Sequence, residues 1–224
     1  MLKHLTNPYL ICFLCIISIV ISIVSNSLHL FTLSNCIFFA IMFLTNYNNL
    51  YVNNGDISRN KRLQVFILII AIYLSFSLFN FFHLFPTLRN TFIAINSVIK
   101  VSYFIWGWIQ ILSTLSKRQK VTGQTIATAI TGYLFIGIIW SFVYFSFWQI
   151  NQNSFHIADL RDFQMKPWNL SMYFSLITLT TVGYGDIIPI YRWLMVFTTF
   201  EAIMGLIYMA VIVARLVSLY DIFD

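Results

Sequence analysis

The residues Thr181-Val182-Gly183-Tyr184-Gly185 form a run that is suited to bind a cation through its backbone. Glycine adopts backbone angles that are closed to other residues. Two glycines at alternating positions therefore allow successive carbonyl oxygens to point the same way. A ring of such oxygens replaces the water around a dehydrated cation.

The elements around this run must hold it at membrane depth. Residues 169–179, just before it, are compatible with a helix but too few to cross a bilayer, which takes about 20 residues. Non-helical backbone at that depth is tolerated only where protein or a water-filled cavity surrounds it. We therefore predict a re-entrant helix followed by a loop, with the partial negative charge of the helix C-terminus directed toward the cation.

Asn169 is expected to begin this short helix as its cap, because asparagine is a favoured N-cap residue. It also opens Asn169-Leu170-Ser171, a glycosylation sequon. Capping is the preferred interpretation, since a residue at the start of a re-entrant helix is not expected to be accessible to a modifying enzyme.

The composition places the chain in a membrane. Of the 224 residues, 59% are hydrophobic and only 9% are charged, whereas a soluble domain carries about 25% charged residues. This excludes a disulfide scaffold, a disordered tail and a cytosolic enzyme. The net charge of +6 is not gathered into a basic cluster interleaved with aromatics, so nucleic-acid binding is not expected.

Apolar segments predict an all-α integral membrane protein with six transmembrane helices, and the re-entrant helix and loop lie between the fifth and the sixth. We divide the chain into a four-helix membrane scaffold, residues 1–120, and a second domain, residues 121–224. The predicted spans cover residues 9–24, 28–44, 64–85, 91–115, 125–148 and 192–219.

Basic residues predict the orientation. With the N-terminus inside, eight lysines and arginines fall in cytoplasmic segments and four outside. This favours cytoplasmic N- and C-termini and an external 149–191 region. The first span could instead be a cleaved signal peptide, given Lys3 before its apolar core and Ser25 after it. Few residues follow the last span, so no cytoplasmic sensor domain is expected on this chain.

The run of residues 181–185 resembles the selectivity filter of potassium channels, and residues 180–186 agree with the longer family signature that ends in Asp186. The resemblance covers residues 125–224. It implies K+ sites at the carbonyls of Thr181, Val182, Gly183 and Tyr184, with the Thr181 hydroxyl. Gly183 and Gly185 would supply the permissive backbone, and the Val182 and Tyr184 side chains would pack behind the filter. A filter needs four loops, which implies a homotetramer.

The resemblance also assigns filter support. In relatives an aromatic residue of the pore helix binds the filter aspartate, and Tyr173 holds that position here. Ile177 stands where some relatives carry a carboxylate. We therefore expect a Tyr173–Asp186 hydrogen bond without the second acid. Thr178 and Thr180, at the base of the pore helix, complete the predicted support.

The last span carries the remaining candidate residues. Gly205 lies at the hinge position of channel inner helices and is either a hinge or a packing residue. Glu201 is the one acidic residue within a span, and we expect it to bond the base of the pore helix through Thr178 or to reach water. Arg215 is expected to snorkel to the interface. One apolar stripe faces either the pore or lipid: Leu206, Met209, Val213 and Val217.

A voltage sensor is not expected. The fourth span holds only Lys100, against about three to four charges per subunit in a working sensor. We expect Lys100 to face a polar neighbour such as Asn96 or the interface between bundles. His83 and His156 are weak candidates for proton sensing. Cys12, Cys15 and Cys36 lie in apolar segments and are interpreted as small apolar residues rather than as a redox pair.

The resemblance implies a potassium-selective channel that conducts K+ passively, is not an enzyme and needs no cofactor. Its inner helix, residues 201–217, resembles that of small bacterial channels, which implies a bacterial plasma membrane. The alternatives are a potassium-uptake transporter subunit, a non-conducting scaffold or accessory protein, and a nonselective cation channel. The opening stimulus, and whether a sensor or accessory subunit supplies it, stay open.

Overall fold

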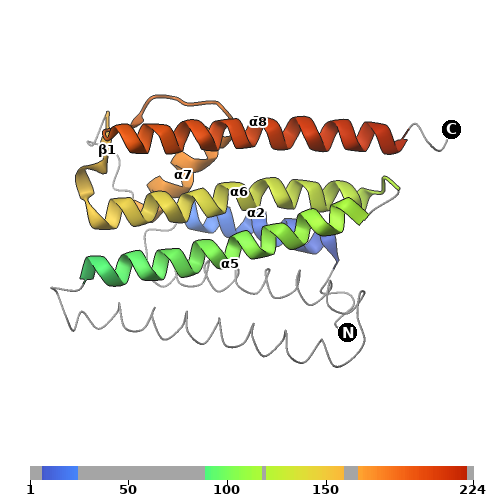
Figure 1. Cartoon of the computed structure of the whole chain (residues 1–224), viewed down its shortest axis with the longest axis horizontal. Helices are drawn as coiled ribbons and strands as arrows, with labels where there is room; N and C mark the ends of the chain where they lie inside the picture. The colour runs from blue at the N-terminus through green and yellow to red at the C-terminus, as the bar shows by residue number, and fades with distance from the viewer. Residues whose placement is uncertain (1–6, 25–88, 118–119, 159–165, 221–224) are drawn as a thin grey trace, which may run out of the picture.

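The computed structural model describes residues 7–24, 89–117, 120–158 and 166–220. Four long helices lie side by side: α2 (Pro8–Val24), α5 (Arg89–Lys117), α6 (Gly123–Ile150) and α8 (Arg192–Tyr220) (Figure 1). The short helix α7 (Pro167–Leu179) fits between α6 and α8 in one half of the bundle. Because α6 packs against α2, α5 and α7, it is the centre of the assembly.

Two helices, α6 and α8, are long and apolar enough to cross a membrane, and the apolar helix α2 is shorter. Helix α5 covers the predicted fourth span. The predicted second and third spans, residues 28–44 and 64–85, lie outside the described residues, as do Cys36 and His83. The six-span topology therefore stays a prediction.

The helix directions follow from contacts at their ends. The start of α2 lies beside the start of α6, since a Cβ at Gly123 would meet the Tyr9 ring. The end of α8 is bonded to the end of α5 by Arg215 and Ser116. Helices α2 and α6 thus run in one direction and α5 and α8 in the opposite one (Figure 1).

The core between α2, α5 and α6 is apolar. Phe104 packs against Phe135 and Phe142 with ring centroids 5.9 and 5.2 Å apart. Cys15 lies fully buried among these helices, and Cys12 and Cys15 are free thiols. Lys100 extends its ammonium group to within 5.5 Å of the Phe142 ring centroid, at the α5–α6 interface, which is the second of its two predicted environments.

The expected all-α fold needs one addition. After α6, the short 3-10 turn η2 (Gln152–Ser154) leads into strand β1 (Phe155–Ile157), which pairs antiparallel with β2 (Ile187–Pro189). The register places His156 opposite Ile188. β-Branched isoleucines favour this extended pairing, and the sheet ties the segment after α6 to the segment after the filter run.

Helix α7 begins two residues before the predicted start, so the expectation that Asn169 caps it is wrong. Pro167 takes the first helical position, where its fixed φ and missing N–H cost nothing. Asn169 then falls inside the first turn, and its Nδ2 donates to the Ile23 carbonyl at the end of α2 at 2.8 Å. Because Asn169 is fully buried, the sequon is inaccessible.

Candidate functional site

The residues after α7 alternate in backbone handedness. The φ angle is positive at Thr181 (59°), Gly183 (48°) and Gly185 (77°) and not at Val182 or Tyr184 between them. Alternating right- and left-handed residues bring successive N–H groups to one side of the chain, which leaves the carbonyls on the other. A positive φ is strained for threonine, so the surrounding structure must hold Thr181 in place.

The amides of this segment turn back into α7. Thr181 N donates to the Thr178 carbonyl at 2.9 Å, and the amides of Val182 and Gly183 donate to the Ile177 carbonyl at 2.9 and 3.1 Å. Among the hydrogen bonds between described residues, none is accepted by a carbonyl of residues 181–185. Those oxygens are therefore left for another partner.

The end of α7 is fully bonded. Thr180 closes it, donating from both its amide and its hydroxyl to the Leu176 carbonyl at 3.0 and 2.7 Å. The Leu179 carbonyl accepts from the Tyr133 hydroxyl of α6 at 3.1 Å. Four carbonyls at this helix end are thus satisfied locally, and the filter segment (residues 181–185) leaves from a fixed base.

Asp186 anchors the other end of the filter segment. The predicted bond is present, with the Tyr173 hydroxyl donating to Asp186 Oδ2 at 2.6 Å. The Ile187 amide donates to Oδ1 at 3.0 Å, and the Ala158 amide donates to the Asp186 carbonyl at 2.9 Å. The last contact continues the β1–β2 sheet, which sequence reasoning missed. Ile177 is buried with apolar neighbours, so α7 offers no second acid here.

If the segment selects K+, as its resemblance to potassium channels implies, Tyr173→Phe is expected to lower the K+-to-Na+ permeability ratio by about 10- to 100-fold, because a hydrogen bond to a carboxylate is worth about 1.5–3 kcal/mol. Ion flux into liposomes measures the ratio. Tyr191→Phe is the matched control: its hydroxyl bonds Asn151 at 2.6 Å, away from the filter segment. An unchanged ratio in Tyr173→Phe would show that the bond does not support the filter.

Glu201 bonds the pore helix, as predicted, but not through Thr178. One carboxyl oxygen lies 2.5 Å from Ser175 Oγ on α7, and the other accepts from the Tyr144 hydroxyl of α6 at 2.6 Å. Ser175 lies about one turn before Thr178 on the same helix face, so the prediction had the right face and the wrong turn. Glu201 has 0% exposure, which excludes the alternative that it reaches water.

Gly205 is a packing residue. It is buried, and a Cβ there would collide with the Leu179 carbonyl oxygen and lie 2.9 Å from Leu179 Cδ1. Helix α8 therefore approaches the end of α7 at a distance that only glycine allows. The stripe predicted to line the lower pore wall is exposed within one chain, at Leu206, Met209, Val213 and Val217.

Arg215 makes a hydrogen bond to α5 that the sequence analysis did not predict. Its Nη2 donates to the Ser116 carbonyl at 2.6 Å, in the last turn of α5, where carbonyls have no partner within the helix. A guanidinium is also favourable beside the negative end of a helix dipole. The contact fixes the end of the inner helix α8 to the end of α5.

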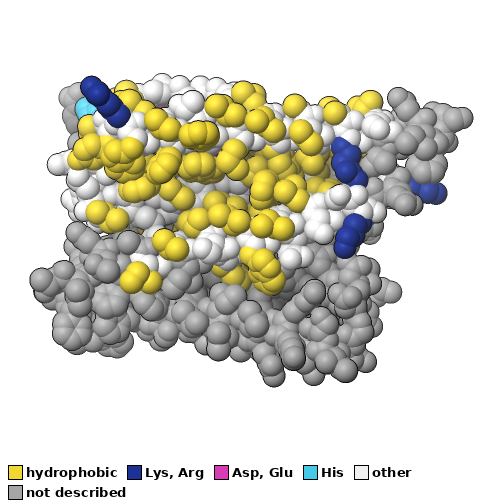
Figure 2. Space-filling view, viewed as in Figure 1, with side chains coloured by type: hydrophobic (Ala, Val, Ile, Leu, Met, Phe, Trp, Pro, Cys, Tyr) yellow, Lys and Arg dark blue, Asp and Glu magenta, His cyan; other side chains and the backbone are white. Residues whose placement is uncertain are grey.

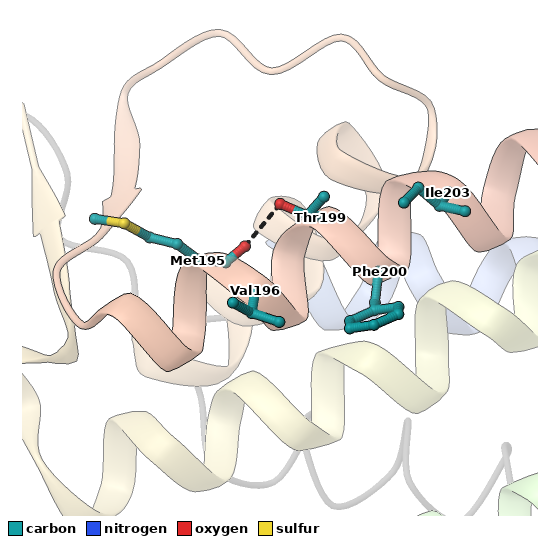
Figure 3. A pocket seen from close by; sticks show the side chains of 5 residues that line it. All are labelled: Met195, Val196, Thr199, Phe200 and Ile203. Atoms are coloured by element: carbon teal, nitrogen blue, oxygen red, sulfur yellow. Dashed lines mark hydrogen bonds between the residues drawn. The ribbon is translucent and has the colours of Figure 1, made fainter.

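The filter segment and the outer half of α8 present apolar side chains outward. Val182 is 51% and Tyr184 is 72% exposed, so one chain by itself does not cover these two side chains, and their packing behind the filter stays a prediction. Nearby on α8, a hollow in the surface is lined by Met195, Val196, Thr199, Phe200 and Ile203 (Figure 3). The face in Figure 2 is likewise mostly apolar, with Lys and Arg near its ends.

Comparison with known proteins identifies the C-terminal part of the chain. Residues 128–221 match the family described as "Ion channel". This segment holds most of α6, all of α7, the filter segment and α8. No curated protein and no solved structure matches the chain. A channel-family match favours a transport protein in a membrane over an enzyme. Residues 128–221 are thus similar to ion channels, which agrees with the resemblance of the filter segment to that of potassium channels.

Proposed function

We propose that the protein is a potassium-selective channel that conducts K+ passively as a homotetramer. The observation that carries this proposal is the alternating backbone of the filter segment, whose first three amides are bonded to α7 while its carbonyls accept no hydrogen bond from described residues. In the proposed filter the carbonyls of Thr181, Val182, Gly183 and Tyr184, with the Thr181 hydroxyl, replace the hydration shell of K+.

The proposed tetramer is supported by the carbonyls and apolar side chains that a single chain leaves exposed. One filter segment supplies one set of carbonyls, and a ring of four is needed around the ion. Tyr184 within that segment and the apolar hollow on α8 are both exposed in one chain. In the proposed assembly a neighbouring subunit covers both. The exposed stripe on α8, from Leu206 to Val217, then lines the lower pore.

The pore domain is proposed to be residues 121–224, with residues 1–120 as scaffold. Two contacts support a scaffold role: Asn169 joins α7 to α2, and Arg215 joins α8 to α5. Lys100 lies over an aromatic ring and is the one charge inside α5. At about 2.3 kcal/mol per charge per 100 mV, four such charges give shallow gating, which current–voltage recordings in bilayers would reveal.

The proposed setting is a bacterial plasma membrane, multi-pass, with both termini cytoplasmic. The parallel pairs α2–α6 and α5–α8 support this orientation. Lys117, Lys120 and Arg215 lie at the ends of helices on the proposed cytoplasmic side. We leave open whether an accessory subunit supplies the opening stimulus.

Ion flux from liposomes that contain the purified protein tests the function. We expect K+ efflux that barium blocks, because a divalent ion of similar size binds more tightly to the same carbonyls, and little Na+ efflux. Equal K+ and Na+ fluxes would indicate a nonselective channel. Flux that needs a second ion or an energy source would indicate a transporter, and no flux from a folded tetramer would indicate a scaffold.

A further inference from the structure

Glu201 joins three helices at one point. It lies on α8, and its two carboxyl oxygens contact Ser175 of α7 and Tyr144 of α6. Ser175 Oγ also lies 2.7 Å from the carbonyl oxygen of Gly137 on α6. Gly137 allows the close approach, since a Cβ there would lie 3.0 Å from Leu176 Cδ2 and 3.8 Å from Ser175 Oγ. We call Glu201, Ser175, Tyr144 and Gly137 the carboxyl cluster.

The hydrogen bonds of the carboxyl cluster can be counted in protons. There are three short oxygen–oxygen contacts: 2.5 Å between Glu201 and Ser175, 2.7 Å between Ser175 and the Gly137 carbonyl, and 2.6 Å between Tyr144 and Glu201. Each requires a hydrogen between the two oxygens. The two hydroxyls carry one hydrogen each, and a carbonyl carries none. An ionised Glu201 would leave one contact without a proton.

A protonated Glu201 satisfies all three contacts. Tyr144 donates to Oε2, the carboxylic acid donates from Oε1 to Ser175 Oγ, and Ser175 passes its own hydrogen to the Gly137 carbonyl. With an ionised acid the one Ser175 hydrogen serves a single acceptor, which leaves lone pairs facing each other either across the 2.7 Å contact to the Gly137 oxygen or across the 2.5 Å contact to Glu201. That arrangement is repulsive in a site that excludes water.

The charge of an ionised acid would also stand alone. Glu201 has 0% exposure, and no basic side chain among the described residues forms an ion pair with it. Removing an uncompensated charge from water costs several kcal/mol even after the protein relaxes, whereas a neutral acid with full hydrogen bonding avoids that cost. The proton count and the burial of Glu201 therefore both indicate a neutral carboxylic acid.

We infer that Glu201 is held as a neutral carboxylic acid and acts as a positioning residue. It holds α7 against α6 and α8 through Ser175, which is hydrogen-bonded to both Glu201 and the Gly137 carbonyl. Helix α7 has no acidic residue of its own, so the inner helix supplies the one acid that holds the base of the filter. The positioning role rests on the proposed function. The protonation state does not.

Infrared spectroscopy of the purified protein in liposomes tests the protonation state. We expect a carbonyl stretching band of a protonated carboxylic acid at neutral pH that is absent in Glu201→Gln. The amide keeps the volume and removes the acid group. Identical spectra in this region for the wild type and Glu201→Gln would overturn the inference, and they would do so whether or not the protein conducts K+.

Flux measurements on three variants test the positioning role. Glu201→Gln is expected to keep the K+-to-Na+ permeability ratio within about twofold, because its carbonyl accepts from Tyr144 and its amide donates to Ser175 as the neutral acid does. Tyr144→Phe and Ser175→Ala each break one link and are expected to lower the ratio about tenfold.

A Glu201→Gln variant as impaired as Tyr144→Phe would show that an ionised carboxylate is required and would contradict the inference. Unchanged permeability ratios in both Tyr144→Phe and Ser175→Ala would contradict the positioning role, since they would show that the carboxyl cluster does not affect the filter segment. A wild type without K+ flux would instead contradict the proposed function and leave the infrared assignment in place.

Discussion

Gly183→Ala is expected to reduce K+ flux to the level of protein-free liposomes. Gly183 has φ +48°, and a Cβ there meets no atom of the described residues within 4 Å. The penalty is therefore one of backbone conformation rather than of space. A left-handed alanine costs about 1–2 kcal/mol, or about 4–8 kcal/mol over four subunits. Relaxing this strain turns the peptide groups of the filter segment and misdirects the carbonyls that would hold K+.

Val182→Ala is the matched control for this prediction. Val182 is the neighbouring residue of the same segment, but its φ is not positive, so alanine fits its backbone without strain. Flux through Val182→Ala should stay within about tenfold of the wild type. If Gly183→Ala conducts K+ as well as Val182→Ala does, then the alternating backbone is not what selects the ion, and the proposed filter geometry is wrong.

Gly205→Ala is expected to lower K+ flux at least tenfold and to reduce the stability of the tetramer. The new methyl group would meet the backbone oxygen of Leu179, which cannot rotate away as a side chain does. Overpacking of this kind costs about 1–3 kcal/mol at each site. Because Leu179 ends α7 two residues before Thr181, any displacement of Leu179 moves the base of the filter segment.

A double variant separates this packing role from a hinge. Leu206 is exposed within the chain, so Gly205→Ala with Leu206→Gly restores a flexible glycine next to the original position without removing the collision. The packing interpretation predicts no recovery of flux. Recovery in the double variant, measured in the same liposome assay with tetramer stability followed on native gels, would instead establish a hinge.

The site was largely predictable where local chemistry decides it. The role of the glycines in the filter segment and the short helix before it follow from one stretch of chain, and the Tyr173–Asp186 bond was expected from the resemblance to potassium channels. Gly205 was also found from the hinge position of channel inner helices, although that position alone left hinge and packing open. These features depend on residues that are close in sequence, so backbone permissiveness and helical spacing suffice.

Other features depend on which helix surfaces pack against each other, and for these the sequence analysis did not identify the hydrogen-bond partners. Asn169 was taken as a helix cap and instead bonds α2, because Pro167 begins the helix earlier. Thr178 was expected to meet Glu201, but Ser175 is the residue that the α7–α8 crossing brings into reach. Tyr144 was not considered at all. A serine and a tyrosine within buried helices were the available signal, since buried hydroxyls require partners.

The sequence by itself determined that this chain lies in a membrane and that residues 181–185 leave helical geometry at a defined point, and it singled out main-chain carbonyls as the groups proposed to bind an ion. These properties come from hydropathy and from the conformational freedom of glycine, which act locally. Only the tertiary structure decided that Gly205 abuts Leu179, that Arg215 caps α5 and that Glu201 meets two hydroxyls. Those contacts join segments far apart in the chain, and their existence depends on helix crossing geometry, which no local pattern encodes.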